Sequence, residues 1–225
     1  IQFEEARVQR EVKVINNLVS LRTAEAQFRL DKGYFTADLD SLIEYLKITP
    51  KKEVYKVGSL TEKQLEDGLT ENKAAKILER ARLKAQRKMK FQGTDSLNLL
   101  YNYIWENDRE VKAEGLQGFR RDTILTNMIQ SLYKGQYTEE TIGEIVYIPY
   151  TDNVKFEVET NNDYTTSQGI KVPIFEIRAH YNTYLHDLNT QERVNLIDKE
   201  EKLDHYPGLK VGSVDAPNNN AGNWE

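Results

Sequence analysis

The sequence contains no cysteine among its 225 residues, which excludes a disulfide framework, a thiolate metal site and a cysteine nucleophile. Histidine and proline are scarce, at three and five residues. No run of 18 or more apolar residues occurs, so no segment of this sequence is predicted to span a bilayer as a helix. What is present, 39% hydrophobic and 30% charged residues over this length, is enough for a globular core with a polar surface.

The charge is negative overall and unevenly distributed. A formal net charge of -5 argues against a protein whose main task is binding phosphates, and we therefore expect no nucleic-acid partner. Residues 141–225 hold 14 acidic and 7 basic side chains, whereas residues 73–90 hold eight basic and one acidic. This asymmetry indicates that the chain contains regions of opposite net charge.

The first thirty residues contain neither glycine nor proline, and their apolar side chains recur at helical spacing. One stripe steps by four, three and four residues from Val8 to Val19, and an adjoining stripe runs from Val14 to Phe28. These spacings predict one amphipathic helix, about 45 Å long and stopped at Gly33, with one end projecting from the domain. We expect this helix to meet partners, through Val8, Val12, Ile15, Val19 and Phe28.

A short second helix and two further short elements are predicted to follow. Thr36 or Asp38 can cap a helix that buries the apolar residues between Leu39 and Leu46. Residues 53–57 predict a strand, and residues 61–68 predict a short helix closed by its glycine.

Residues 70–90 predict a helix rich in lysine and arginine. Its charged faces are expected to be solvated, because no aromatic side chains accompany the cations. Contact with an anionic membrane or an acidic partner is the alternative. Its apolar side consists of Ala74, Ile77, Leu78, Ala81, Ala85 and Met89.

Residues 95–105 are strongly apolar and predict a buried helix. Its aromatic residues are spaced as helical core residues, which favours packing over a ligand groove. A polar loop is predicted over residues 106–118 and another helix over residues 123–133. The aromatic residues are Tyr101, Tyr103 and Trp105.

Beyond residue 140 the pattern becomes typical of strands. Runs rich in Val, Ile, Phe and Tyr at residues 144–150, 155–160 and 172–180 predict three antiparallel strands. A helix capped by Asn189 and Glu192 is predicted from Thr190 to about Leu203. An irregular tail should follow, with an exposed tryptophan near its end.

Residues 17–46 resemble the helix exit of type IV pilins and pseudopilins. In that family a long helix with an alanine-rich stretch and an aromatic residue ends at a glycine-aromatic pair, before a short Asp-Leu-x-x-Leu helix. Here those places are taken by residues 23–28, by Gly33 and Tyr34, and by residues 39–42. The resemblance implies assembly through the long helix. The first residues depart from it, because Ile1-Gln-Phe-Glu-Glu is polar where a pilin is apolar.

The same stretch, with residues 58–65, 173–176 and 220–225, resembles an uncharacterised family of single-span bacterial inner-membrane proteins. This resemblance covers most of the chain. It implies a membrane helix just before Ile1 and a body outside the cytoplasm, and it carries no assigned activity.

The predicted fold class is α+β, with a long N-terminal helix, a helical middle region and a C-terminal antiparallel sheet of about three to four strands. Residues 1–50 should form a pilin-like stem of a long and a short helix. Residues 51–140 should be mostly helical. Residues 141–225 should form the antiparallel region with one helix and the tail. We expect the three regions to pack as one body.

Motifs for catalysis and metal binding are missing from the sequence. The three histidines, at 180, 186 and 205, lack zinc-ligand spacing, and no Gly-x-Ser-x-Gly elbow or phosphate-binding loop occurs. Asp152 and Asp163 stand in oxygen-rich loops and are candidate calcium ligands, with turn formation as the alternative. We predict no catalytic residues and no cofactor.

These observations favour a non-enzymatic structural or interaction domain of a membrane-anchored bacterial envelope protein. Its predicted location is the periplasmic side of the inner membrane. Its partners would be other envelope proteins or copies of itself, and a segment preceding Ile1 would meet the membrane. The alternative is a periplasmic ligand-binding domain that uses the C-terminal sheet and its Asn/Asp loops. An enzyme of unrecognised type is the third hypothesis.

Overall fold

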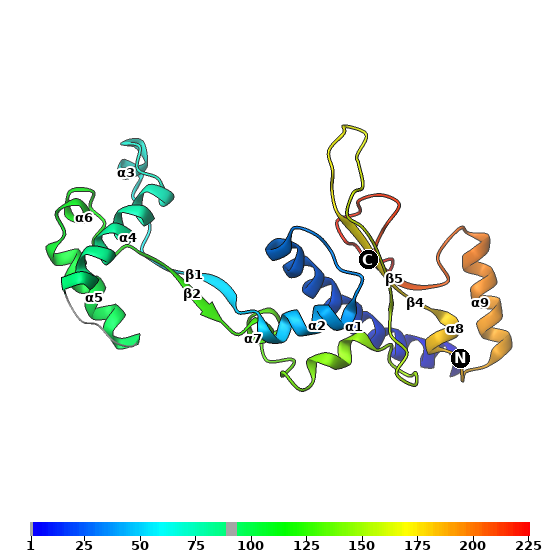
Figure 1. Ribbon diagram of the computed structural model, residues 1–225. Coiled ribbons are helices and arrows are strands. Elements are labelled where there is room, and N and C mark those ends of the chain that lie inside the picture. The colour runs from blue at the N-terminus through cyan, green and yellow to red at the C-terminus, as the bar shows by residue number, and fades with distance from the viewer. Residues whose placement is uncertain (1, 89–93) are drawn as a thin grey trace. The chain divides into compact units, whose positions relative to one another are not determined.

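The computed structural model describes residues 2–88 and 94–225, which form two compact units (Figure 1). The main unit consists of Ile1–Pro50 and Asn127–Glu225, and the inserted unit consists of Lys51–Thr126. The predicted division after residue 50 is present. The second division lies after residue 126, where we expected 140. Helices and small antiparallel sheets together confirm the predicted α+β class.

The long helix predicted at the start of the chain is α1 (Gln2–Lys32), which ends where Gly33 takes a φ of 88°. It leads to α2 (Leu39–Ile48), which is capped by Asp38, whose carboxylate accepts from the backbone N–H groups of residues 40 and 41. Of the described helices, none combines the length and apolarity needed to cross a bilayer.

The stripe of α1 that faces the core is the one predicted to run from Val14 to Phe28. Its first turns do not project freely, because Phe3 packs against the core and Arg10 donates to the carbonyl oxygen of Tyr184 at 2.7 Å. The prediction that one end of α1 projects from the domain is therefore wrong for the face that carries Phe3 and Arg10. The buried residues of α1 are Val14, Leu18, Ser20, Leu21, Ala24, Glu25 and Phe28.

The predicted helix over residues 123–133 is wrong in its first half. Arg120–Thr126 form strand β2, which pairs antiparallel with β1 (Lys51–Val57), and Val54 stands opposite Thr123. Only Met128–Tyr133 are helical, as α7, and Asn127 caps that helix by accepting from the N–H of Gln130. Pairing with a strand seventy residues earlier decides the conformation of β2, and local spacing does not report such a partner.

The strand predicted over residues 144–150 is also wrong. Ile142–Val146 form a 3-10 helix, η1, whose Ile142, Ile145 and Val146 are buried. These three residues recur at spacings of three and one, which suits a single helical turn against the core. Tyr147 retains a strand-like contact, an isolated bridge to Lys155, and backbone N–H groups of Ile148 and Phe156 donate to the carbonyl oxygens of Val154 and Val146.

The C-terminal sheet has three strands, as expected in number, but only two of them are strands that the sequence predicted. β3 (Glu157–Asn161), β4 (Ile174–His180) and β5 (Gly208–Gly212) lie in the order β3-β4-β5, all antiparallel. β5 comes from the tail that we expected to be irregular. Trp224, expected to be exposed, is partly buried against the core of the main unit.

Two helices lie between β4 and β5. They are α8 (Tyr181–Tyr184) and α9 (Thr190–Lys202). The predicted cap of α9 is confirmed, since Asn189 accepts from the N–H of Glu192.

Gly212 permits the close approach of β5 to β4. Its φ is 76°, and an added Cβ would lie 2.1 Å from the carbonyl oxygen of Phe175. Gly212→Ala should therefore lower the free energy of unfolding by about 2 kcal/mol, measured by urea denaturation. Gly143→Ala is the control, because nothing lies within 4 Å of its added Cβ. Equal losses in the two variants would contradict this account of β5.

The described part of the inserted unit contains four helices, three of which contribute buried residues to its own core. Between β1 and β2 the chain forms α3 (Glu62–Glu66), α4 (Glu71–Lys88), α5 (Thr94–Asn107) and α6 (Arg109–Ala113). The predicted basic helix is α4, and Met89, assigned to its apolar side, lies outside the described residues. α6 occupies part of the region predicted as a loop. Tyr101 is buried in the core as predicted, and Tyr103 and Trp105 pack against it.

Candidate functional site

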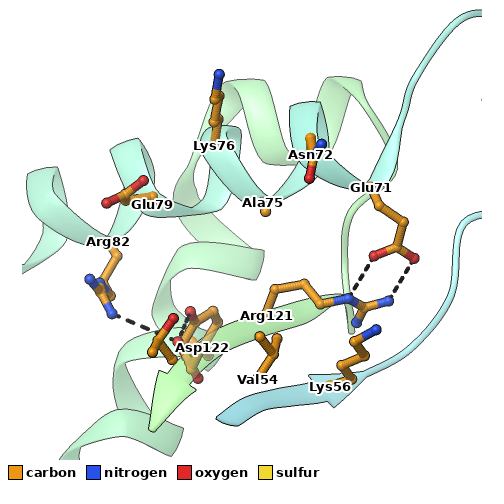
Figure 2. A pocket seen from close by; sticks show the side chains of 12 residues that line it. Val54, Lys56, Glu71, Asn72, Ala75, Lys76, Glu79, Arg82, Arg121 and Asp122 are labelled. Atoms are coloured by element: carbon orange, nitrogen blue, oxygen red, sulfur yellow. Dashed lines mark hydrogen bonds and ion pairs between the residues drawn. The ribbon is translucent and has the colours of Figure 1, made fainter. Parts of the chain in front are cut away.

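A groove of about 730 Å³ lies in the inserted unit between α4 and the two-stranded β1–β2 ribbon. Figure 2 shows Ala75 pointing from α4 toward the ribbon, and Val54 and Arg121 on the ribbon below it. The register puts Val54 beside Thr123 and Lys56 beside Arg121 on this face of the ribbon. The charged residues of the lining are Lys56, Glu71, Lys76, Glu79, Arg82, Arg121 and Asp122.

Arg121 closes one end of the groove. Its Nε and Nη2 donate to the two carboxylate oxygens of Glu71 at 2.8 and 2.9 Å, as dashed lines in Figure 2 show. Its Nη1 and Nη2 also donate to the carbonyl oxygens of Val57 and Gly58, both at 3.0 Å. The guanidinium lowers the pKa of Glu71 through these hydrogen bonds. Both charges of this pair are committed to holding α4 against the ribbon.

Asp122 forms the other end of the groove and is buried. Its carboxylate accepts from the hydroxyl of Tyr101 and from Nε of Arg120. The guanidinium of Arg120 lies 4.8 Å from the ring centre of Tyr55 and 4.6 Å from that of Tyr101. Burial, followed by the hydrogen bond to Asp122, raises the pKa of Tyr101 well above its usual value. Asp122 therefore organises a buried polar cluster.

Arg82 has a buried donor atom that lacks a hydrogen-bond partner among the described residues. Its Nη1 lies 3.8 Å from the nearer carboxylate oxygen of Asp122, which is too far for a hydrogen bond. Its Nε is buried and has no hydrogen-bond partner among the described residues. Figure 2 shows the side chain descending from α4 toward Asp122. A buried donor without a partner costs free energy, so the Nε of Arg82 is an unsatisfied polar group within this unit.

The surroundings of the groove are electropositive. Among the described residues, Lys56 and Lys76 have no ion-pair partner, while two of the three lining carboxylates, Glu71 and Asp122, are engaged. The inserted unit has 16 Lys and Arg against 12 Asp and Glu, a formal charge of +4, in a chain of net charge -5. The arrangement can therefore attract and hold a negatively charged group.

The residues predicted to form the partner surface of α1 do not lie on one surface. Val8 and Val12 are 49% and 54% exposed, whereas Phe28 is 6% exposed and belongs to the core. Ile15 and Val19 are half-buried. Of the five predicted contact residues, the exposed ones are therefore Val8 and Val12 in the first turns of α1. Phe28 as a contact residue is wrong because its ring packs against Tyr34 and Tyr45.

The two candidate calcium ligands lie in different surroundings. Asp163 is exposed in the β3–β4 loop, and its carboxylate accepts from Nζ of Lys171 at 3.1 Å. Asp152 lines a cavity of about 620 Å³ in the main unit, together with Asp187. Within the described ranges, no three His, Cys, Asp or Glu side chains gather as a metal site.

The histidines have local roles in the described structure. Nδ1 of His180 accepts from the N–H of Asn182 at 3.0 Å and so caps α8. Nδ1 of His186 lies 3.0 Å from the carbonyl oxygen of Thr183, and Nδ1 of His205 lies 3.1 Å from a carboxylate oxygen of Glu200.

Glu25 is a functional candidate that the sequence interpretation missed. It is fully buried on α1, four residues after Leu21 and three before Phe28, so its position on the buried stripe was a usable signal. Its Oε2 accepts from the N–H of Thr36 at 3.1 Å, and its Oε1 has no partner among the described residues. Burial raises the pKa of this carboxyl to about 8. Glu25 is therefore protonated in the folded chain at neutral pH.

The groove was missed for a different reason. Its ribbon face depends on β2, which the sequence interpretation assigned partly to a loop and partly to a helix. The basic helix was recognised, but the strands opposite it were not.

Comparisons of the chain with protein-family models, with curated proteins and with solved structures found no match. The likeness of residues 17–46 to the pilin helix exit stays a prediction. The groove, the exposed turns of α1 and the buried glutamate are the features of this chain from which a function can be argued.

Proposed function

We propose that this chain is the non-enzymatic structural and interaction domain of a membrane-anchored bacterial envelope protein. The proposal includes a body on the periplasmic side and an inner-membrane segment before Ile1. The observation that carries it is the course of α1. This helix is unbroken over 31 residues, and its fully buried side chains begin only at Val14. In this proposal α1 continues a membrane helix from before Ile1, while its contacts from Phe3 onward anchor it to the main unit.

The helix exit supports the pilin-like part of the proposal. α1 ends at Lys32, and the next residue, Gly33, takes a φ of 88°. The chain then continues past Tyr34 to α2, which Asp38 caps. This course of helix, glycine-aromatic pair and short helix is consistent with the resemblance of residues 17–46 to pilins. In assembly, α1 would bind neighbouring proteins while the sheet and α2 keep it in place.

The contact surface in this proposal is the exposed side of the first turns of α1. Val8 and Val12 are four residues apart and therefore lie on one face of the helix. Both are about half exposed, so burying them against another apolar surface would contribute favourably to association. Other envelope proteins, or a second copy of this chain, are the proposed occupants.

Fractionation of cells that express the full-length protein with its natural upstream sequence tests the proposal. The protein should stay in the membrane fraction after alkaline carbonate extraction, and its body should be cleaved by protease added to spheroplasts. Recovery in the soluble cytoplasmic fraction would refute both the anchor and the location.

A photo-crosslinking residue at position 12 tests the surface. It should yield a discrete adduct in intact membranes, while the same residue at Glu44, an exposed position on α2, should not. Adducts of equal yield from both positions would argue against α1 as the contact surface.

A second candidate function is ligand binding by the main unit. The observation that favours it is the cavity of about 620 Å³ beside the loop of residues 150–154, lined also by Asn182, His186 and Asp187. Binding of calcium or a sugar there should raise the melting temperature of the chain by mass action. Asp152→Asn should abolish that rise, and an unchanged melting temperature with all such ligands would rule this candidate out.

A further inference from the structure

We propose that a row of five cations on α4 binds the anionic headgroups of a phospholipid membrane. This inference rests on the proposed membrane anchor, which would bring the chain to a lipid surface, and it names a second membrane contact made by the inserted unit. It uses no residue of α1. The five cations, which form the basic stripe, are Lys73, Lys76, Arg80, Lys84 and Arg87.

The basic stripe lies along one face of α4. Its members follow one another at spacings of three, four, four and three residues, which places them on one side of an α-helix. All five are exposed, and the steps from residue 73 to residue 87 measure about 21 Å along the helix. Figure 2 shows Lys76 pointing from α4 away from the β1–β2 ribbon. The stripe is therefore open to an extended charged surface.

The protein itself neutralises the basic stripe only in part. Arg80 pairs with Glu110 at 2.5 Å, and Nζ of Lys84 lies 4.0 Å from a carboxylate oxygen of Asp108. Like charges three or four residues apart repel one another and destabilise a helix. A negatively charged surface along the stripe would remove this repulsion. The members without an ion-pair partner in the described ranges are Lys73, Lys76 and Arg87.

The composition of this face favours a lipid layer over a folded protein. Three of the five cations are lysines, and lysine is depleted at protein interfaces, where aromatic and other large apolar anchors dominate. The apolar side chain beside the stripe is Leu83, which is 48% exposed. A phospholipid layer accepts cations at its headgroups and an apolar side chain beneath them, and it requires no matching shape.

The same face does not suit nucleic acid. Proteins that bind single strands combine a basic surface with aromatic side chains on which the bases stack. α4 contains no aromatic residue. The net charge of -5 on the whole chain would also repel a long polyanion.

Flotation of the chain of residues 1–225 with lipid vesicles tests the proposal. The probes are vesicles of neutral phosphatidylcholine and vesicles in which about a third of the lipid is anionic phosphatidylglycerol. We expect half of the chain to bind the anionic vesicles below about 1 mM lipid at low salt, and none to bind the neutral vesicles at that concentration. Raising sodium chloride from about 50 to about 500 mM should weaken binding at least about tenfold, because salt screens the attraction.

Variants of the stripe show whether its charge carries the binding. The triple variant Lys76→Gln/Lys84→Gln/Arg87→Gln should bind about a hundredfold more weakly, which corresponds to about fivefold for each cation. Lys76→Arg/Lys84→Arg/Arg87→Lys changes the same positions but keeps their charge, so it should bind within about threefold of the parent. Leu83→Gln should weaken binding by about fivefold, because it removes the apolar contact.

A triple variant in the main unit is the matched control. Lys32→Gln/Lys47→Gln/Lys202→Gln replaces three exposed lysines outside the inserted unit and changes the net charge by the same amount as the stripe variant. It should bind the anionic vesicles within about threefold of the parent, because attraction to a lipid surface falls off within a Debye length.

The outcomes that overturn the proposal are distinct. Equal binding to both kinds of vesicle, no binding at about 5 mM lipid, or equal losses in the two Gln triple variants would each reject it. Anisotropy of a labelled oligonucleotide of about 20 bases and of labelled poly-glutamate is measured in the same buffer. A lower dissociation constant for either polymer than for the anionic vesicles would assign the stripe to nucleic acid or to an acidic protein instead. None of these results bears on carbonate extraction of the full-length protein, so failure here is distinguishable from failure of the anchored-envelope proposal.

Discussion

Glu25→Gln should stabilise the main unit by about 3 kcal/mol at pH 8, a gain that disappears toward pH 4.5. The parent carboxyl is fully buried, with one oxygen bonded to the N–H of Thr36 and the other without a partner among the described residues. Burial raises its pKa from 4.5 to about 8. The amide can still accept from Thr36 and carries no charge to bury.

The direction of the pH dependence follows from this pKa. Below pH 4.5 the carboxyl is protonated in both the folded and the unfolded chain, and its contribution to stability is fully present. As the pH rises toward about 8, the unfolded chain ionises first, and stability is lost. The parent should therefore weaken between pH 5 and about 8, whereas Glu25→Gln should lack this component.

Urea denaturation across this pH range measures the effect. The chain has two tryptophans, so a Trp105→Phe background leaves Trp224, which packs in the main unit, as the fluorescent reporter. Gln27→Glu is the control, because residue 27 is not fully buried on the same helix. Parallel pH curves for the parent and Glu25→Gln would contradict a buried, protonated Glu25.

Asp122→Ala should lower the free energy of unfolding of the inserted unit by about 3 kcal/mol. The carboxylate is 4% exposed and accepts from Tyr101 and Arg120, which are themselves 2% and 9% exposed. Removing it would leave a buried guanidinium and a buried hydroxyl without their acceptor. Asp122→Asn, which keeps one acceptor oxygen, should lose less.

A Trp224→Phe background makes Trp105 the reporter of the inserted unit in the urea experiment, since Trp105 packs against that unit's core. Thr123→Val is the control, because Thr123 is exposed on the next position of β2 and valine keeps the β-branched side chain. Comparable losses in Asp122→Ala and Thr123→Val would mean that strand propensity, and not the buried cluster, stabilises this part of β2.

The elements that could be predicted from the sequence are those with strong local signals. Asp38 and Asn189 stand at helix starts where their side chains accept backbone N–H groups, and both act as caps. Gly33 ends α1 with a positive φ, as its position after a long glycine-free helix indicated. Each depends on residues within one or two turns, so tertiary context does not override it.

The errors concern segments whose partner is distant in the chain. β2 pairs with β1 across roughly seventy residues, and β5 pairs with β4 across about thirty. Residues 144–150 have the composition of a strand, yet η1 fills a place in the core where one helical turn fits. For short apolar runs, composition alone does not separate a strand from a buried turn.

The candidate site could be predicted only in part. The cations of α4 were evident, since eight basic residues crowd positions 73–90. Which of these cations have an ion-pair partner depends on the carboxylates that face them in the fold. Arg121 is neutralised by Glu71, fifty residues away, and Arg82 is left unsatisfied because Tyr101 and Arg120 already hold Asp122.

The sequence by itself determined the α+β class, the length of α1, its stop at Gly33 and the basic character of α4, because periodicity, glycine and charge act locally. Only the tertiary structure decided which of the two stripes of α1 is buried, that residues 51–126 form a separate unit, and that Glu25 is enclosed without a full set of partners. The physical reason is that burial and pairing are properties of neighbours in space, and those neighbours here are distant in sequence.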